Sequence, residues 1–158
     1  MNAIMKDYYP VFRYYQALRE QLLDLLNDDD LAFAVEGNEP LGELCREIGE
    51  VQHAYIESFK TLNIDFSYRN PQPELTSSVD ALRDWYGQLD RRLEAVIEGF
   101  TDVQLAEIIV DRGGDFKVPL HIHLDIYKEA LLIFYGKVRV YLRAMGKDLP
   151  EQWREWIG

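Results

Sequence analysis

Three histidines, one cysteine and 28 acidic residues are the side chains of this chain that could ligate a metal or take part in catalysis. A helical bundle that holds two metal ions needs Glu-x-x-His on each of two helices and one more glutamate on each of the other two. Glu50 and His53 have this spacing, but apolar residues stand three positions before His121 and His123. Because the second motif is absent, the pattern disfavours a di-iron centre and is typical of a solvated helix face.

A second arrangement places His121, Asp125 and Glu129 at four-residue spacing, in one row of a helix. Such a row could hold zinc or nickel, but it is more typical of a solvated stripe with weak charge pairing. Cys45 falls on or beside an apolar stripe, where a thiol behaves as a small hydrophobe. The sequence contains no phosphate-loop, dinucleotide-binding or serine-hydrolase motif. These residues alone therefore indicate no standard catalytic centre.

Four amphipathic segments have to position these side chains. Apolar residues recur every three or four positions and predict four long helices, at residues 6–26, 41–62, 78–100 and 119–145. Ser77 or Ser78 can cap the start of the third helix. Gly146 suits the left-handed end of the fourth helix.

The connecting segments suggest how the helices are arranged. Residues 63–76 include two prolines and are long enough to cross one end of a bundle, which allows the second and third helices to run parallel. Residues 106–118 contain a Gly-Gly pair typical of a short hairpin or an irregular loop. Residues 148–158 are expected to form a short tail. The sequence therefore predicts an all-α fold, a four-helix bundle with a long crossover between helices two and three.

Composition limits the class of protein and its partners. A chain of 158 residues, 47% of them hydrophobic, is expected to form one domain over residues 1–158. Its net charge of -11 disfavours nucleic acid and anionic membrane surfaces, because binding to phosphates depends on Lys and Arg. No apolar run approaches the roughly 20 residues of a membrane span, and the first ten residues do not resemble a secretory signal. We therefore expect a cytoplasmic protein.

The chain resembles the DinB-like, or YfiT-like, superfamily in three stretches: "LGELCREIGEVQHAYIESF", "LRDWYGQLDRRLEAVIEGFTDVQL" and "YGKVRVYLRAMGKDLPEQW". This resemblance implies a bundle of up-down-down-up topology and a homodimer that forms through exposed helix faces. The last long helix of that family usually reads His-Glu-x-x-His-Arg-Gly-Gln before a Tyr-Leu-Arg-x-x-Gly segment. Its two histidines join a third from the second helix to bind a divalent metal, and members with the full triad resemble metal-dependent thiol transferases.

The family's ligand positions fall on other residues in this chain. With Gly136 aligned to the family's glycine, the two positions of the last helix fall on Ala130 and Phe134, and the segment "LCREI" puts Glu47 at the third. Alanine and phenylalanine have no ligating atom. We therefore expect that the metal site is lost, that no cofactor binds, and that Ala130, Phe134 and Tyr127 line an apolar pocket or a packed core. The resemblance then implies a divergent protein that is non-catalytic or binds a small molecule.

The alternative is a metal site that has moved along the bundle. His123 lies seven residues before Ala130 on the same helix face, and His53 lies six residues after Glu47. In antiparallel helices both displacements are about 9 to 10 Å in one direction, although six residues also turn His53 about 120° away from the Glu47 face. Glu47, His53 and His123 could then bind zinc or nickel in a thiol transferase-like or hydrolase-like enzyme. Lone histidines at such positions are more often structural or solvent-facing.

Overall fold

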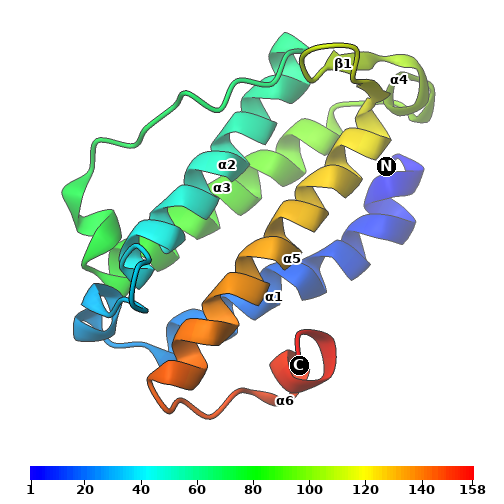
Figure 1. Cartoon of the computed structure of the whole chain (residues 1–158). Coiled ribbons are helices and arrows are strands. Elements are labelled where there is room, and N and C mark those ends of the chain that lie inside the picture. Colours follow the sequence, from blue (N-terminus) through cyan, green and yellow to red (C-terminus); the bar gives the residue numbers. More distant parts are fainter.

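The computed structural model describes residues 1–158 and contains four long helices that lie side by side: α1 (Tyr9–Leu25), α2 (Leu41–Thr61), α3 (Val79–Glu98) and α5 (Leu120–Ala144) (Figure 1). Helices α2 and α3 run in one direction, and α1 and α5 run in the other (Figure 1). The predicted four-helix bundle and its up-down-down-up order are confirmed. A π-helical turn, Ile4–Tyr8, leads into α1. None of the helices combines the length and the apolar character that a membrane span requires.

Local sequence signals account for most of the helix ends. The Ser78 side chain accepts a hydrogen bond from the Ala81 amide at 3.2 Å, as predicted for a cap. At the end of α5, Gly146 has φ +71°, which favours glycine. The Gly146 amide donates to the Arg143 carbonyl, and the Lys147 amide donates to the Leu142 carbonyl at 2.9 Å. This pair of bonds closes the helix as a Schellman motif.

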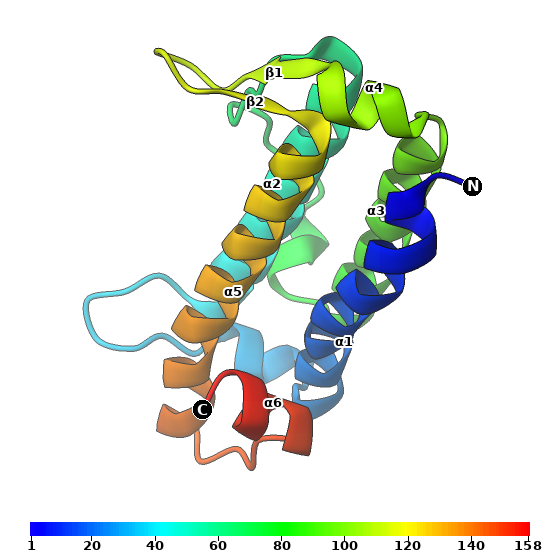
Figure 2. The same cartoon turned by 90° about the vertical axis from the view of Figure 1, so that its right-hand side faces the viewer.

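The predicted hairpin and crossover meet at one end of the bundle (Figure 2). Strands β1 (Ile109–Asp111) and β2 (Lys117–Pro119) pair antiparallel with Val110 opposite Val118. The crossover between α2 and α3 starts beside β1, where the Ile64 amide donates to the Asp111 carbonyl at 3.1 Å. It then returns along the outer side of α2 through a 3₁₀ turn, Pro73–Thr76, which allows α2 and α3 to run parallel (Figure 1).

Two short helices were not predicted. Helix α4 (Asp102–Glu107) begins at a capping box formed by Thr101 and Gln104. Residues 148–158, expected to be a tail, instead contain α6 (Glu151–Trp156), which lies beside the ends of α1 and α5 (Figure 2). Its Trp153 is fully buried and donates its indole N–H to the Leu18 carbonyl at 2.9 Å. The expectation of a tail was wrong. This segment folds because Trp153 is buried against α1, and the spacing of apolar residues within the segment cannot predict such a distant contact.

A charged pair lies in the otherwise apolar centre of the bundle. Arg19 of α1 is completely buried and donates to Asp90 of α3 and to Gln52 of α2, each at 2.6 Å. Gln52 also donates to Asp90 at 2.8 Å, and the guanidinium lies 4.2 Å from the centre of the Tyr86 ring. Burial alone lowers the pKa of Arg19, but Asp90 and the nearby tyrosines raise it above its ordinary value. Three helices are thus joined by one ion pair and its hydrogen bonds, although the buried Arg19 Nε has no hydrogen-bond partner.

Candidate functional site

A groove with Glu47 at its centre runs between α2, α5 and the crossover. Three cavities of about 170, 330 and 430 Å³ each have Glu47 in their wall. We call the smallest the apolar slot, and its lining residues are Leu44, Glu47, Ile48, Val51, Ala130, Ile133, Phe134 and Lys137. We call the 330 Å³ cavity the polar basin, and its lining residues are Glu39, Glu43, Arg46, Glu47, Glu50, Val51, Phe66 and Arg69.

The apolar slot lies where the antiparallel helices α2 and α5 face each other. Six of its eight lining residues are hydrophobic. Phe134 is buried with 5% of its surface exposed, and Ala130 is small enough to leave space beside the ring. Glu47 is exposed. The slot therefore combines an apolar wall with two charged side chains, Lys137 and Glu47, and Glu47 also lines the polar basin.

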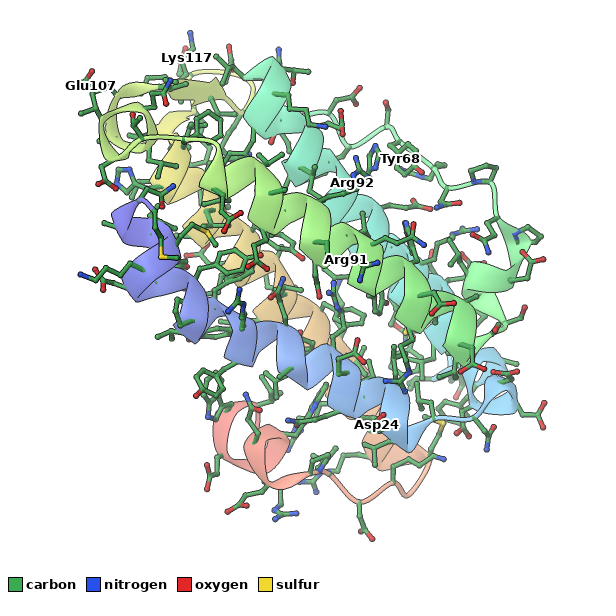
Figure 3. All side chains as sticks on the ribbon, turned by 180° about the vertical axis from the view of Figure 1, so that it is seen from behind. Asp24, Tyr68, Arg91, Arg92, Glu107 and Lys117 are labelled. Atoms are coloured by element: carbon green, nitrogen blue, oxygen red, sulfur yellow. The ribbon has the colours of Figure 1, made fainter.

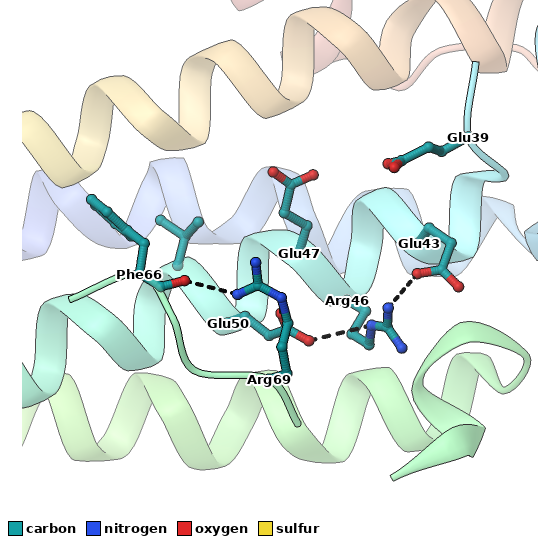
Figure 4. Close-up of a pocket in the computed structure, with 8 residues that line it drawn as sticks. Glu39, Glu43, Arg46, Glu47, Glu50, Phe66 and Arg69 are labelled. Carbon is teal, nitrogen blue, oxygen red and sulfur yellow. Dashed lines mark hydrogen bonds and ion pairs between the residues drawn. The ribbon is translucent and has the colours of Figure 1, made fainter. Parts of the chain in front are cut away.

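Ion pairs between α2 and the crossover shape the polar basin (Figure 4). Glu50 is only 7% exposed and lies 3.3 Å from the Arg46 Nε and 3.6 Å from the Arg69 Nε. The Asn70 amide donates to the same carboxylate at 3.3 Å, and Arg46 also pairs with Glu43. Because Arg69 and Asn70 belong to the crossover, Glu50 holds that segment against α2 and so forms one wall of the basin.

Three charged side chains of the groove lack a partner within the chain. The carboxylates of Glu39 and Glu47 and the ammonium of Lys137 make no hydrogen bond or ion pair, whereas Glu43, Glu50, Arg46 and Arg69 are all paired. Two unpaired acids and one unpaired base leave the groove with a negative excess. Of the two unpaired acids, only Glu47 lines the apolar slot, and it lines the polar basin as well.

The structure brings together the three positions at which the resemblance implies a metal site. Glu47, Ala130 and Phe134 all line the apolar slot, as the alignment on Gly136 predicts. Only Glu47 supplies a ligand atom, because methyl and phenyl groups cannot coordinate a cation. This donor set does not fit a zinc or nickel ion.

His123 is wholly buried near the hairpin, away from Glu47. Arg112 of the hairpin donates to its Nδ1 at 2.9 Å, so Nε2 carries the proton and donates to Ser58 Oγ at 2.6 Å. The Ser58 hydroxyl in turn donates to the Tyr55 carbonyl at 2.6 Å. Burial, and then the charge of Arg112, lowers the pKa of His123 to about 4. Both ring nitrogens of this neutral histidine are engaged within the protein.

His53 lies on a different side of α2, toward α3. Its ring stacks on Tyr68 with 3.7 Å between centroids, and Arg92 lies 3.4 Å from its Nδ1. Figure 3 shows Tyr68 and Arg92 close together on this surface. Burial and the Arg92 charge lower the pKa of His53. The structure therefore does not bring His53 and His123 together, and it contains no group of three His, Cys, Asp or Glu side chains that could hold a metal ion.

The other residues singled out in the sequence also have structural partners or lie in the core. Tyr127 does not line the slot. It is fully buried between the rings of Phe12 and Tyr55, at centroid distances of 5.8 and 5.1 Å. It faces the bundle centre because it lies about one sixth of a turn from Ala130, on the side of α5 toward α1. Cys45 is also buried, which raises the pKa of its thiol to about 12.

The row of His121, Asp125 and Glu129 is not arranged as a metal site either. His121 Nδ1 lies 3.0 Å from the Leu105 carbonyl. Asp125 accepts a hydrogen bond from the Tyr8 hydroxyl at 2.9 Å and pairs with Lys128.

The sequence pattern did not single out Arg46 and Arg69 as residues of the polar basin. The spacing of Glu43, Arg46 and Glu50 could have indicated the ion pairs within α2, but nothing local places Arg69 beside them.

Comparisons with known proteins agree with this fold. Residues 13–125 match the family pattern of the DinB superfamily. A DinB-like protein from Bacillus cereus ATCC 10987 has a similar crystal structure, with a TM-score of 0.74 and 20% identity over 90% of this chain and 93% of that one. A DinB-like protein from Bacillus subtilis gives a TM-score of 0.64 and 20% identity over 86% of this chain and 90% of that one. No curated protein matches in sequence. The chain belongs to the DinB superfamily.

Proposed function

We propose that this protein is a non-catalytic member of its superfamily that binds a small molecule in the Glu47 groove, a ligand with an apolar body and a cationic head. The observation that carries this proposal is the unpaired carboxylate of Glu47 at the junction of the apolar slot and the polar basin. A ligand whose apolar part fills the slot gains about 25 cal/mol for each Å² removed from water. Its ammonium group then reaches Glu47 and forms a charge-assisted hydrogen bond.

The charges of the groove favour a cation over an anion. Arg46 and Arg69 are already paired with Glu43 and Glu50. Lys137 is the only unpaired base, against two unpaired acids. An anionic head would therefore meet net repulsion, whereas a cationic head would relieve the repulsion between the free carboxylates.

The groups that line the slot support a non-catalytic role. The related metal-dependent chemistry needs three ligands, and two of the three positions are occupied by Ala130 and Phe134. Glu47 is the only side chain of the slot, apart from Lys137, that can exchange a proton. The slot has no serine, cysteine or histidine among its lining residues, so it offers neither a Ser-His or Cys-His pair nor an imidazole to hold a metal ion.

A matched pair of probes tests the ligand class. Phenethylamine and 3-phenylpropionate have similar apolar bodies and opposite charges. Isothermal titration calorimetry is expected to detect the amine and not the acid. Glu47→Gln should weaken amine binding about tenfold, because it removes one charged hydrogen bond. Ala130→Leu should abolish binding, because the added side chain fills the slot. Equal binding of both probes, or binding unchanged in both variants, would contradict the proposal.

Elemental analysis tests the loss of the metal separately. Protein purified without chelator is expected to contain no stoichiometric zinc or nickel. Stoichiometric metal that disappears in a His123→Gln variant would overturn the non-catalytic proposal and favour the relocated site. A trace of metal that is unchanged in this variant would leave the amine proposal intact.

A further inference from the structure

An open depression of about 340 Å³ lies on the surface of α3. Its lining residues are Gln88, Arg91, Arg92 and Ala95, none of which lines the Glu47 groove. Spacings of three, four and seven residues put these side chains on one face of the helix. Figure 3 shows Arg91 and Arg92 on this face, with Tyr68 of the crossover beside Arg92. We call this cavity the α3 depression, and two guanidinium groups share it.

The Arg91 guanidinium is free to bind a ligand. Arg91 is exposed and makes no ion pair or side-chain hydrogen bond within the chain. A Cβ atom built at Gly87 would lie 3.5 Å from the Arg91 Nη1, so the guanidinium lies over a stretch of backbone that carries no side chain. All five of its N–H groups therefore remain available to an acceptor from outside the protein.

The charges around Arg92 leave this part of the surface positive. Arg92 donates to Glu57 of α2 at 2.7 Å, and Lys60 donates to the same Glu57 oxygen at 3.1 Å. One carboxylate is thus shared by two bases, and Arg91 adds a third. Arg92 also lies 3.4 Å from the His53 Nδ1, and the His53 ring is stacked on Tyr68. The depression therefore combines a free guanidinium with a second one whose charge is only partly neutralised.

The net charge of -11 limits the kind of anion that suits this site. Asp84 and Glu98 stand seven residues before and after Arg91 on α3, which is about 10 Å along the axis at 1.5 Å per residue. Salt screens exposed charges over about this distance at physiological ionic strength. A small anion at Arg91 therefore meets mainly bases. A nucleic acid would extend over the acidic surface beyond them, where its phosphates are repelled.

We propose that the α3 depression binds the phosphate group of a small phosphate monoester. A phosphate monoester carries nearly two negative charges at neutral pH. The free fork of Arg91 donates to two of its oxygens, and Arg92 contributes its charge from the same cavity. A volume of 340 Å³ lies within the range of small-molecule sites. The organic part of the ligand packs against Ala95 and the aliphatic stems of Gln88 and Arg91. This site is separate from the Glu47 groove, so it does not rest on the proposed function.

Phenyl phosphate is the probe for this site, and its binding to the full chain is measured by isothermal titration calorimetry. Arg91→Gln and Arg92→Gln should each weaken binding at least about tenfold, because each removes a charged partner of the phosphate. Arg91→Lys keeps the charge and loses the fork, so it should cost less than Arg91→Gln. Circular dichroism checks that every variant is folded.

Two control variants separate this site from a general effect of charge and from the Glu47 groove. Arg143→Gln changes the net charge by the same amount at an exposed, unpaired residue of α5, and it should leave binding unchanged. Glu47→Gln should also leave it unchanged. Equal losses in Arg91→Gln and Arg143→Gln would show non-specific attraction and contradict the proposal. So would a loss or gain confined to Glu47→Gln, which would place the phosphate in the groove.

The imidazole of His53 reports binding at this site independently. Burial lowers the pKa of His53, and the charges of Arg92 and Lys60 lower it further, while Glu57 raises it. A bound dianion offsets the two positive charges, so the pKa measured by NMR at constant ionic strength should rise when phenyl phosphate is added. The rise should be absent in Arg91→Gln. A pKa of His53 that does not respond to phenyl phosphate in the wild type would refute binding at the α3 depression.

Discussion

At the scale of single residues, His123 couples protonation to stability. Its pKa lies near 6.5 in the unfolded chain and about 4 in the folded protein, chiefly because of burial and then because of Arg112. The folded state therefore excludes a proton that the unfolded state binds. The stabilisation from neutral His123 is fully present above pH 6.5 and is lost as the pH falls toward about 4. At about 1.4 kcal/mol for each pKa unit, the loss is about 3 kcal/mol.

Urea unfolding measured across this pH range checks the effect. His123→Gln removes the titrating group and retains an amide that can bond to Ser58 and Arg112. The variant is expected to lose less stability than the wild type between pH 6.5 and about 4. The comparison with the variant is needed because the pKa of His53 is also lowered, so His53 also contributes to the loss of stability as the pH falls. Identical pH profiles for the two proteins would show that His123 is not the responsible group.

At the scale of elements, α2 and α5 face each other across the apolar slot, which Glu47, Ala130 and Phe134 line. The family match covers residues 13–125 and ends before Ala130 and Phe134, the two positions of α5 that face Glu47 across the apolar slot. The three positions that the family resemblance assigns to metal ligands therefore lie in the wall of one cavity. This predicts that histidines at these positions can bind a metal ion.

The triple variant Glu47→His/Ala130→His/Phe134→His is expected to bind zinc or nickel, because three imidazoles would then line one cavity. Binding to the folded state alone should raise its melting temperature when metal is added. The matched control carries asparagine at the same three positions and should show no such rise. A folded histidine variant with no metal-dependent stabilisation would show that the alignment on Gly136 is wrong.

At the scale of the whole molecule, the ion pair of Arg19 and Asp90 links three helices through the bundle centre. Asp90→Ala leaves the fully buried guanidinium without its counter-charge. The expected cost is about 3 kcal/mol of unfolding free energy, near the lower end for a broken buried pair, since water can reach the Asp90 side. Asp84→Ala is the control, because Asp84 is exposed on the same helix and unpaired. Equal losses in denaturant unfolding would contradict a structural role for this pair.

The sequence by itself determined the four long helices and which side chains share one face of each helix. Apolar periodicity, the Ser78 cap and the Gly146 end depend on residues within a few positions of one another, so they could be predicted locally. Ala130 and Phe134 share one face of α5 because they are four residues apart, and that spacing can be read from the sequence.

Only the tertiary structure decided which distant residues meet. The burial of His123 under Arg112, the docking of Trp153 on α1 and the contact of Arg69 with Glu50 all join segments between 11 and 135 residues apart. Such contacts arise because the burial of apolar surface favours one packing arrangement of the whole chain. The local sequence around each residue is compatible with many packing arrangements. For the same reason, the sequence could name His53 and His123 as partners, and only the packed bundle separates them.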